Sequence, residues 1–189
     1  MLFYRRRLPH WFPDDATVFV TWRLAGSVPP GMARVGQTIA VCGLPTQVAP
    51  HATFLQHDTH LDRSDFGPVW LGDPRVASML TAALQHGETA RQFYNLHAWV
   101  IMPNHVHVVL EPQVAMPGIM RWLKGRTARM ANRILGRTGM QFWQEESFDH
   151  WVRSEEELQA AVNYVEENPV KAGLVETKEQ WAWPSARRL

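Results

Sequence analysis

The segment from Phe93 to Leu110 constrains the fold of this chain more than any other stretch of its sequence. It holds two runs rich in apolar, aromatic and β-branched residues, 93–102 and 106–110, and such runs favour β-strands. Pro103-Asn104 separates the two runs, and a Pro-Asn pair is a turn signal. The segment therefore predicts two neighbouring antiparallel strands.

Further elements are predicted on both sides of this strand pair. Residues 17–24 are rich in β-branched and aromatic residues and predict a first strand. Two segments carry apolar residues at helical spacing, Pro74 to about His86 and Pro117 to about Leu135. A capping-box pattern at Ser154–Glu157 opens a third helix. We expect that helix to stop near Asn168, because the proline after it disfavours helical geometry in the preceding residue.

This order of strands and helices predicts an α+β fold, with an antiparallel sheet and helices packed on one of its faces. A length of 189 residues fits a single domain spanning residues 1–189. The stretch from Gly26 to about Asp65 has no steady period and is punctuated by Gly, Pro, His and Thr. Because such a length without regular structure is unusual in a compact domain, we interpret residues 26–65 as an irregular insertion or loop, functional or mobile.

The distribution of charge is more informative than its total. The formal net charge is +1, which says little about partners. From Arg121 to Arg137, however, every charged residue is a cation. A nearly neutral protein with such a basic segment can still offer phosphates a positive strip.

Cysteine content and hydropathy indicate in which cellular compartment the protein is expected. The single cysteine, Cys42, excludes a disulfide framework and a zinc site built on cysteines, and it favours a reducing cytoplasm. No segment approaches the roughly 20 apolar residues that span a bilayer, and no signal-peptide pattern follows the basic N-terminus. We therefore expect a cytoplasmic protein without a membrane partner.

His105-Val106-His107 is the first candidate for a site. Residues two apart on a strand point to the same face, so both imidazoles would project together while Val106 enters the opposite side. Two adjacent imidazoles can hold a divalent metal that keeps open positions for a phosphate oxygen. The alternative is a pair of polar residues on a solvated strand face, and the spacing is compatible with both.

Tyr164 is the second candidate. At about 100° per residue it falls at the flank of the apolar stripe between Leu158 and Val165, not at its centre. Asn168 lies one turn further on the same side, so a phenol and an amide emerge together. Two alternatives stay open: a helix-edge tyrosine with its hydroxyl in water, and an asparagine that caps its own helix end.

These residue types together suit one reaction. A tyrosine can attack a phosphodiester when the phosphate is held in line and its charge is relieved, and a metal relieves that charge as a Lewis acid. The covalent phosphotyrosine conserves the energy of the cleaved bond, which allows later rejoining. His105, His107 and Tyr164, with a third ligand such as Asn168, would suffice for this chemistry.

The basic helix predicted from Pro117 is the third candidate. A cationic groove with aromatic platforms can hold single-stranded nucleic acid without base pairing. A solvated amphipathic helix with ordinary surface arginines is the alternative. The residues that we expect to contact DNA are Arg121, Lys124, Arg126, Arg129 and Trp143.

Five short motifs follow one another in the order that one known family has them. LHAWVIMPNHVHVVL at 96–110 is similar to a strand-turn-strand with an HUH motif, and YVEENPVKAGLV at 164–175 is similar to a helix end that carries a nucleophile. The other motifs are KGRT at 124–127, the segment 142–153 and WAWPSA at 181–186. In these motifs the chain resembles the HUH-type single-tyrosine transposases, and within them the REP-associated tyrosine transposases, over roughly residues 66–186.

This resemblance implies a metal-dependent single-strand DNA endonuclease and strand transferase. His105 and His107 would bind Mg²⁺ or Mn²⁺, with Asn168 as a further ligand, and Tyr164 would form a 5′-phosphotyrosine and leave a free 3′-hydroxyl. The fold would be ferredoxin-like, with the HUH strand near the centre of its sheet. The partner would be hairpin-forming repeat DNA exposed as a single strand, bound by a nucleoid-associated monomer or homodimer.

A second hypothesis is a domesticated relative that binds repeat hairpins without cutting them. Its basic residues and tryptophans would be kept for DNA, while its metal site would be idle. A zinc hydrolase is a weaker third reading, because zinc sites usually have at least three protein ligands and no third ligand stands at a familiar spacing.

Overall fold

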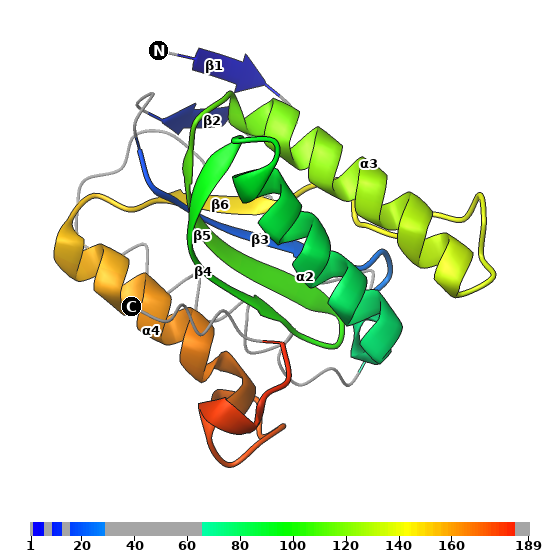
Figure 1. Ribbon diagram of the computed structural model, residues 1–189. Coiled ribbons are helices and arrows are strands. Elements are labelled where there is room, and N and C mark those ends of the chain that lie inside the picture. Colours follow the sequence, from blue (N-terminus) through cyan, green and yellow to red (C-terminus); the bar gives the residue numbers. More distant parts are fainter. Residues whose placement is uncertain (1, 6–8, 13–15, 29–65, 184–189) are drawn as a thin grey trace.

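The computed structural model describes residues 2–5, 9–12, 16–28 and 66–183 (Figure 1). The main sheet consists of β3 (Val18–Arg23), β4 (Tyr94–Ile101), β5 (His105–Pro112) and β6 (Phe148–Trp151). The helices are α2 (Pro74–Thr89), α3 (Met116–Ile134) and α4 (Glu155–Lys171). The short elements are the hairpin of β1 (Leu2–Arg5) with β2 (Pro9–Phe12) and the 3-10 turns η2 (Trp70–Gly72) and η3 (Lys178–Gln180). None of the described helices has the length and apolar character needed to cross a bilayer.

The sheet has the connectivity of a ferredoxin-like fold. Its elements follow the chain as β3-α2-β4-β5-α3-β6, and the strands lie in the order β4-β5-β3-β6 with antiparallel neighbours. The predicted α+β class and the interior position of the strand that carries both histidines are confirmed. Of the predicted insertion at about 26–65, all but residues 26–28 lie outside the described residues.

The β4–β5 hairpin forms where Pro103-Asn104 predicts a turn. The amide of Met102 donates to the carbonyl of His105 at 2.9 Å and closes the turn. The amide of Leu24 donates to the carbonyl of Asn104 at 2.8 Å, which ties the turn to the end of β3. The short strand β6 was not predicted, since its residues are exposed or half-buried and show no clear alternation.

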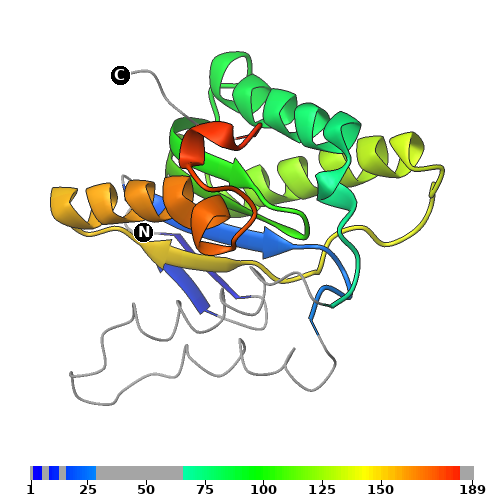
Figure 2. The same cartoon turned by 90° about the horizontal axis from the view of Figure 1, so that it is seen from below.

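The structure corrects one part of the predicted architecture, because helices cover both faces of the sheet. α2 and α3 lie side by side over a core that includes Trp22 and Val106, and α4 lies on the opposite face against Phe19 and Val109 (Figures 1 and 2). The physical reason is visible in β3, which is buried at five successive positions, Val18–Trp22. Strands that are apolar on both faces need cover on both faces.

The start of α4 is fixed to the sheet. Ser154 Oγ accepts a hydrogen bond from the amide of Glu157 at 3.2 Å, as the capping pattern predicts. The carboxylate of Glu157 accepts one from the amide of Arg153 at 2.8 Å and lies 2.7 Å from Nε2 of His150 on β6. The helix that carries Tyr164 is therefore anchored to an edge strand at its N-terminal end.

The far end of α4 differs from the prediction. The helix continues through Pro169 and ends at Lys171, one turn beyond the expected stop at Asn168. The proline removes one backbone hydrogen bond, but Val165 and Pro169 are buried against the sheet. Gly173, at φ +69°, then closes the helix in the left-handed conformation. Burial of this turn outweighs the local preference of the residue before proline.

Candidate active site

The two histidines of β5 point to the face of the sheet that α4 covers. Both are fully buried, while Val106 between them belongs to the core on the other face. Their Nε2 atoms lie 2.8 Å apart. Two ligands at right angles, each about 2.1 Å from one octahedral cation, are about 3.0 Å apart. The imidazoles are therefore close to the spacing that a shared cation requires.

Each imidazole is oriented by a buried side chain. His105 Nδ1 lies 2.6 Å from Asn104 Oδ1, and His107 Nδ1 lies 2.7 Å from Thr21 Oγ1. An amide oxygen only accepts, so His105 donates from Nδ1 and its Nε2 carries a lone pair. A threonine hydroxyl donates or accepts, so His107 can present either an N–H or a lone pair at Nε2. Thr21 and Asn104 thus allow both rings to offer lone pairs to one cation.

Burial also sets the charge of the two rings. Loss of solvent lowers the pKa of His105 to about 3. It lowers the pKa of His107 well below its ordinary value, and the neighbouring His105 adds to this effect. Both rings are neutral at pH 7, which is the form in which histidine binds metals.

Helix α4 brings Tyr164 to the histidines. The ring centroids of Tyr164 and His107 lie 5.8 Å apart with an angle of 75° between the rings. A second edge contact joins Tyr164 to Phe19, with centroids 6.0 Å apart. Ala161 and Val165 are buried in the core beneath α4, which fixes the rotation of the helix so that Tyr164 faces the sheet.

Asn168 is the polar residue of the site with no evident structural role. Its side chain is fully buried, and neither amide atom has a hydrogen-bond partner among the described residues. Its backbone carbonyl, not its side chain, accepts the closing bond from the amide of Ala172 at 2.9 Å, so the alternative of a side-chain cap does not apply. A buried polar group without a partner costs about 1–3 kcal/mol. A ligand at the amide would offset that cost.

The donor set fits a divalent cation with open coordination positions. Two neutral imidazole nitrogens and one amide oxygen are available on the same face. Within the described ranges, no cluster of three or more His, Cys, Asp or Glu is placed to hold a metal. A cation at this site would therefore depend on Asn168, water or substrate to complete its coordination.

The basic residues of α3 lie on the opposite side of the sheet from the histidines. Arg121, Arg126 and Arg129 are exposed. Lys124 is half-buried, and its ammonium donates to the carbonyl of Glu145 at 2.7 Å. DNA that touched both α3 and Tyr164 would have to pass around an edge of the sheet.

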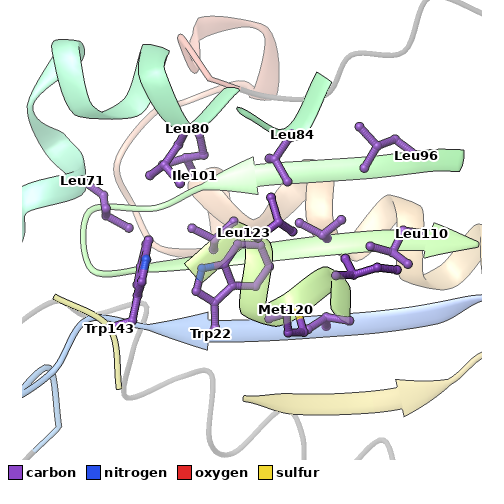
Figure 3. Close-up of a cluster of buried hydrophobic side chains, with 14 of the residues drawn as sticks. Trp22, Leu71, Leu80, Leu84, Leu96, Ile101, Leu110, Met120, Leu123 and Trp143 are labelled. Carbon is purple, nitrogen blue, oxygen red and sulfur yellow. The ribbon is translucent and has the colours of Figure 1, made fainter. Parts of the chain in front are cut away.

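The structure corrects the predicted DNA contact of Trp143. This residue is only 5% exposed and lies in the core beside Trp22 (Figure 3). Its indole Nε1 donates to Thr127 Oγ1 at 2.9 Å, and its ring meets that of Trp22 edge-on at 6.2 Å. The indole fills the core under α3 and has no face available for a base.

Sequence reasoning missed three polar residues of this site. Asn104 could have been found, since it precedes His105 directly in a turn. Thr21 and Arg23 could not, because they come from β3 and meet the histidines through the register Thr21↔His107 and Arg23↔His105. Arg23 is half-buried, and loss of solvent lowers the pKa of its guanidinium. It places a cation on the strand next to His105.

Comparison with known proteins identifies the family of this chain. Residues 74–168 match the family described as "Transposase IS200 like". The chain belongs to this family. The resemblance that five sequence motifs predicted is thereby confirmed at the level of the family.

Two proteins that are similar to this IS200-like chain are REP-associated tyrosine transposases. The one from Escherichia coli (strain K12) is 24% identical over 96 residues, which are 50% of this chain and 56% of that protein. The chain therefore matches little more than half the length of this curated relative. A solved structure of a REP-associated tyrosine transposase bound to a REP hairpin has a TM-score of 0.55 and 17% identity, covering 100% of this chain and 84% of that one. This second match shows a shared fold.

Proposed function

We propose that this chain is a metal-dependent single-stranded DNA endonuclease and strand transferase that acts on hairpin-forming repeat DNA. The observation that supports the proposal is that α4 places Tyr164 next to the two histidines of β5. The ring of Tyr164 lies 5.8 Å from that of His107, whose Nε2 is 2.8 Å from Nε2 of His105. The solved relative bound to a REP hairpin supports hairpin DNA as the substrate.

His105, His107 and Asn168 would hold the cation, with Mg²⁺ and Mn²⁺ as the candidates. When bound, it would supply Lewis-acid relief of the charge on a phosphate. Thr21 and Asn104 keep the imidazoles in the orientation that points both Nε2 atoms to one place. Burial keeps both rings neutral, so protons do not compete for these nitrogens at pH 7.

The proposed step is an attack of the Tyr164 oxygen on a DNA phosphorus. A bond forms between this oxygen and phosphorus, and the bond from phosphorus to the 3′ oxygen breaks. The products are a 5′-phosphotyrosine and a free 3′-hydroxyl. The phenol loses one proton to solvent and the 3′ oxygen gains one, so protons balance. Because the phosphotyrosine conserves the bond energy, a second 3′-hydroxyl can reverse the step and join a strand.

The exposed arginines of α3 would extend the surface that binds DNA. Arg121, Arg126 and Arg129 are exposed to solvent on α3. They would contact the phosphate backbone and fix the hairpin, not read its sequence. Half-buried Lys124 would join them if it released the carbonyl of Glu145.

Cleavage of a hairpin oligonucleotide in Mn²⁺ tests the proposal. Wild type should cut, while Tyr164→Phe should bind the hairpin and the metal but not cut. Equal cutting by the Phe variant would exclude Tyr164 as the nucleophile. Hairpin binding that survives a chelator, with no cleavage under any divalent ion, would instead support the non-cleaving hairpin-binding protein.

A further inference from the structure

Lys171 lies on the same side of α4 as Tyr164 and Asn168. Two turns of helix separate Lys171 from Tyr164, which brings the two side chains to within about 20° of each other around the helix axis. The ammonium Nζ of Lys171 lies 4.8 Å from the centroid of the Tyr164 ring. This placement depends on the continuation of α4 through Pro169. A helix that ended at Asn168 would not have carried Lys171 on this stripe.

The charge of Lys171 is not neutralised within the described part of the chain. Its side chain is exposed, and its contact there is the face of the phenol ring. The nearest carboxylates along α4 have another partner. Lys178 Nζ lies 2.7 Å from Glu166 and 4.0 Å from Glu167. The acidic residues one turn before Lys171 are thus held by a different cation.

The contact of Lys171 with the ring face is weak enough for a stronger ligand of the ammonium to replace it. The attraction between an exposed ammonium and a ring face is weak. A hydrogen bond from an ammonium to a charged phosphate oxygen is shorter and stronger. Lysine is a compact charge on a flexible four-carbon stem, so Nζ can leave the ring face and follow a phosphate at the end of the phenol.

We propose that Lys171 binds the phosphate that Tyr164 attacks. This inference rests on the proposed function and adds a residue to the same site. With DNA bound, the ammonium of Lys171 donates to a non-bridging oxygen of that phosphodiester. It offsets the charge that collects there while the bond to the Tyr164 oxygen forms and the bond to the 3′ oxygen breaks. Lys171 keeps its proton throughout.

Single-turnover cleavage of saturating hairpin DNA in Mn²⁺ tests this role. Lys171→Gln should lower the rate constant by about 10-fold or more, since removal of one charge-stabilising donor costs up to about 10³-fold in other enzymes. Lys171→Arg, which keeps the charge, should restore the rate to within a factor of a few. Arg75→Gln removes an exposed cation at the start of α2 and should leave the rate unchanged. A rate for Lys171→Gln within a factor of two of wild type would overturn the proposal.

A binding measurement separates this inference from the proposed function. Hairpin affinity is measured against salt concentration in chelator, in a Tyr164→Phe background that cannot cut. In that background, Lys171→Gln removes one phosphate contact. It should lower the magnitude of the slope of log affinity against log salt concentration by about 0.7–1. If wild type does not cleave, the nuclease proposal fails, and a lowered slope still supports Lys171 as a phosphate ligand. An unchanged slope with an unchanged melting temperature removes Lys171 from the site in either case.

Discussion

Replacing Thr21 by valine tests how the histidines are held. Valine has nearly the shape of threonine, so Thr21→Val removes the hydroxyl without opening a cavity. Thr21 Oγ1 lies 2.7 Å from His107 Nδ1, and the two residues are 5% and 0% exposed. The variant leaves a buried imidazole nitrogen without its partner, which costs about 1–3 kcal/mol. For a chain of this size, that corresponds to a melting temperature lower by about 2–12 °C.

The same substitution should also weaken metal binding. A hydroxyl that accepts from His107 Nδ1 allows His107 Nε2 to present its lone pair, and loss of such a partner typically costs about 10–100-fold in metal affinity. Isothermal titration with Mn²⁺ at pH 7 measures this directly. Mn²⁺ binding as tight in Thr21→Val as in wild type would show that the hydroxyl plays no part in orienting the ring.

The chain offers a matched control for this experiment. Thr81, on α2, has a buried hydroxyl with no hydrogen-bond partner among the described residues. Thr81→Val makes the same chemical change on the other side of the sheet, where no hydrogen bond is lost. It should leave Mn²⁺ affinity unchanged and should not lower the melting temperature.

Three further predictions follow from the burial of individual groups. Asn168→Leu should raise the melting temperature of the metal-free protein, because it removes a buried amide without a partner, and should weaken Mn²⁺ binding; a loss of metal-free stability would contradict this. Trp143→Phe should lower the urea midpoint, since it opens space in the core, and should leave the hairpin affinity of the folded protein unchanged. Weaker DNA binding by this variant would support the DNA contact that the sequence predicted for Trp143. The metal-free protein should lose stability as pH falls from 6.5 toward about 3. The depressed pKa values of His105 and His107 mean that the folded state binds fewer protons than the unfolded state there. Urea unfolding against pH measures this, and His105→Gln should flatten the curve.

The parts of this fold that depend on neighbours along the chain could be predicted from sequence. The alternation of His105, Val106 and His107 fixes which side chains share a face, and the Pro103-Asn104 turn fixes the hairpin. Helical periodicity likewise located α2 and α3 to within a few residues.

The parts that depend on distant residues could not be predicted in the same way. Thr21 reaches His107 because β3 inserts between β5 and β6, and no local pattern encodes that register. The apolar character of both sheet faces decides where α4 packs, and tertiary burial carries α4 through Pro169. Trp143 is aromatic and close to basic residues in sequence, but its indole is drawn into the core by Thr127 and its neighbours.

In the proposed reaction, Tyr164 becomes covalently joined to DNA at a site built by His105 and His107. Peptide mapping by mass spectrometry, after wild-type protein has been incubated with hairpin DNA and Mn²⁺ and then denatured, tests it most directly. We expect a 5′-phosphorylated nucleotide on Tyr164, which should be absent in chelator and in His107→Gln. Cut DNA with the adduct on another residue, or with no adduct at all, would exclude Tyr164 as the nucleophile.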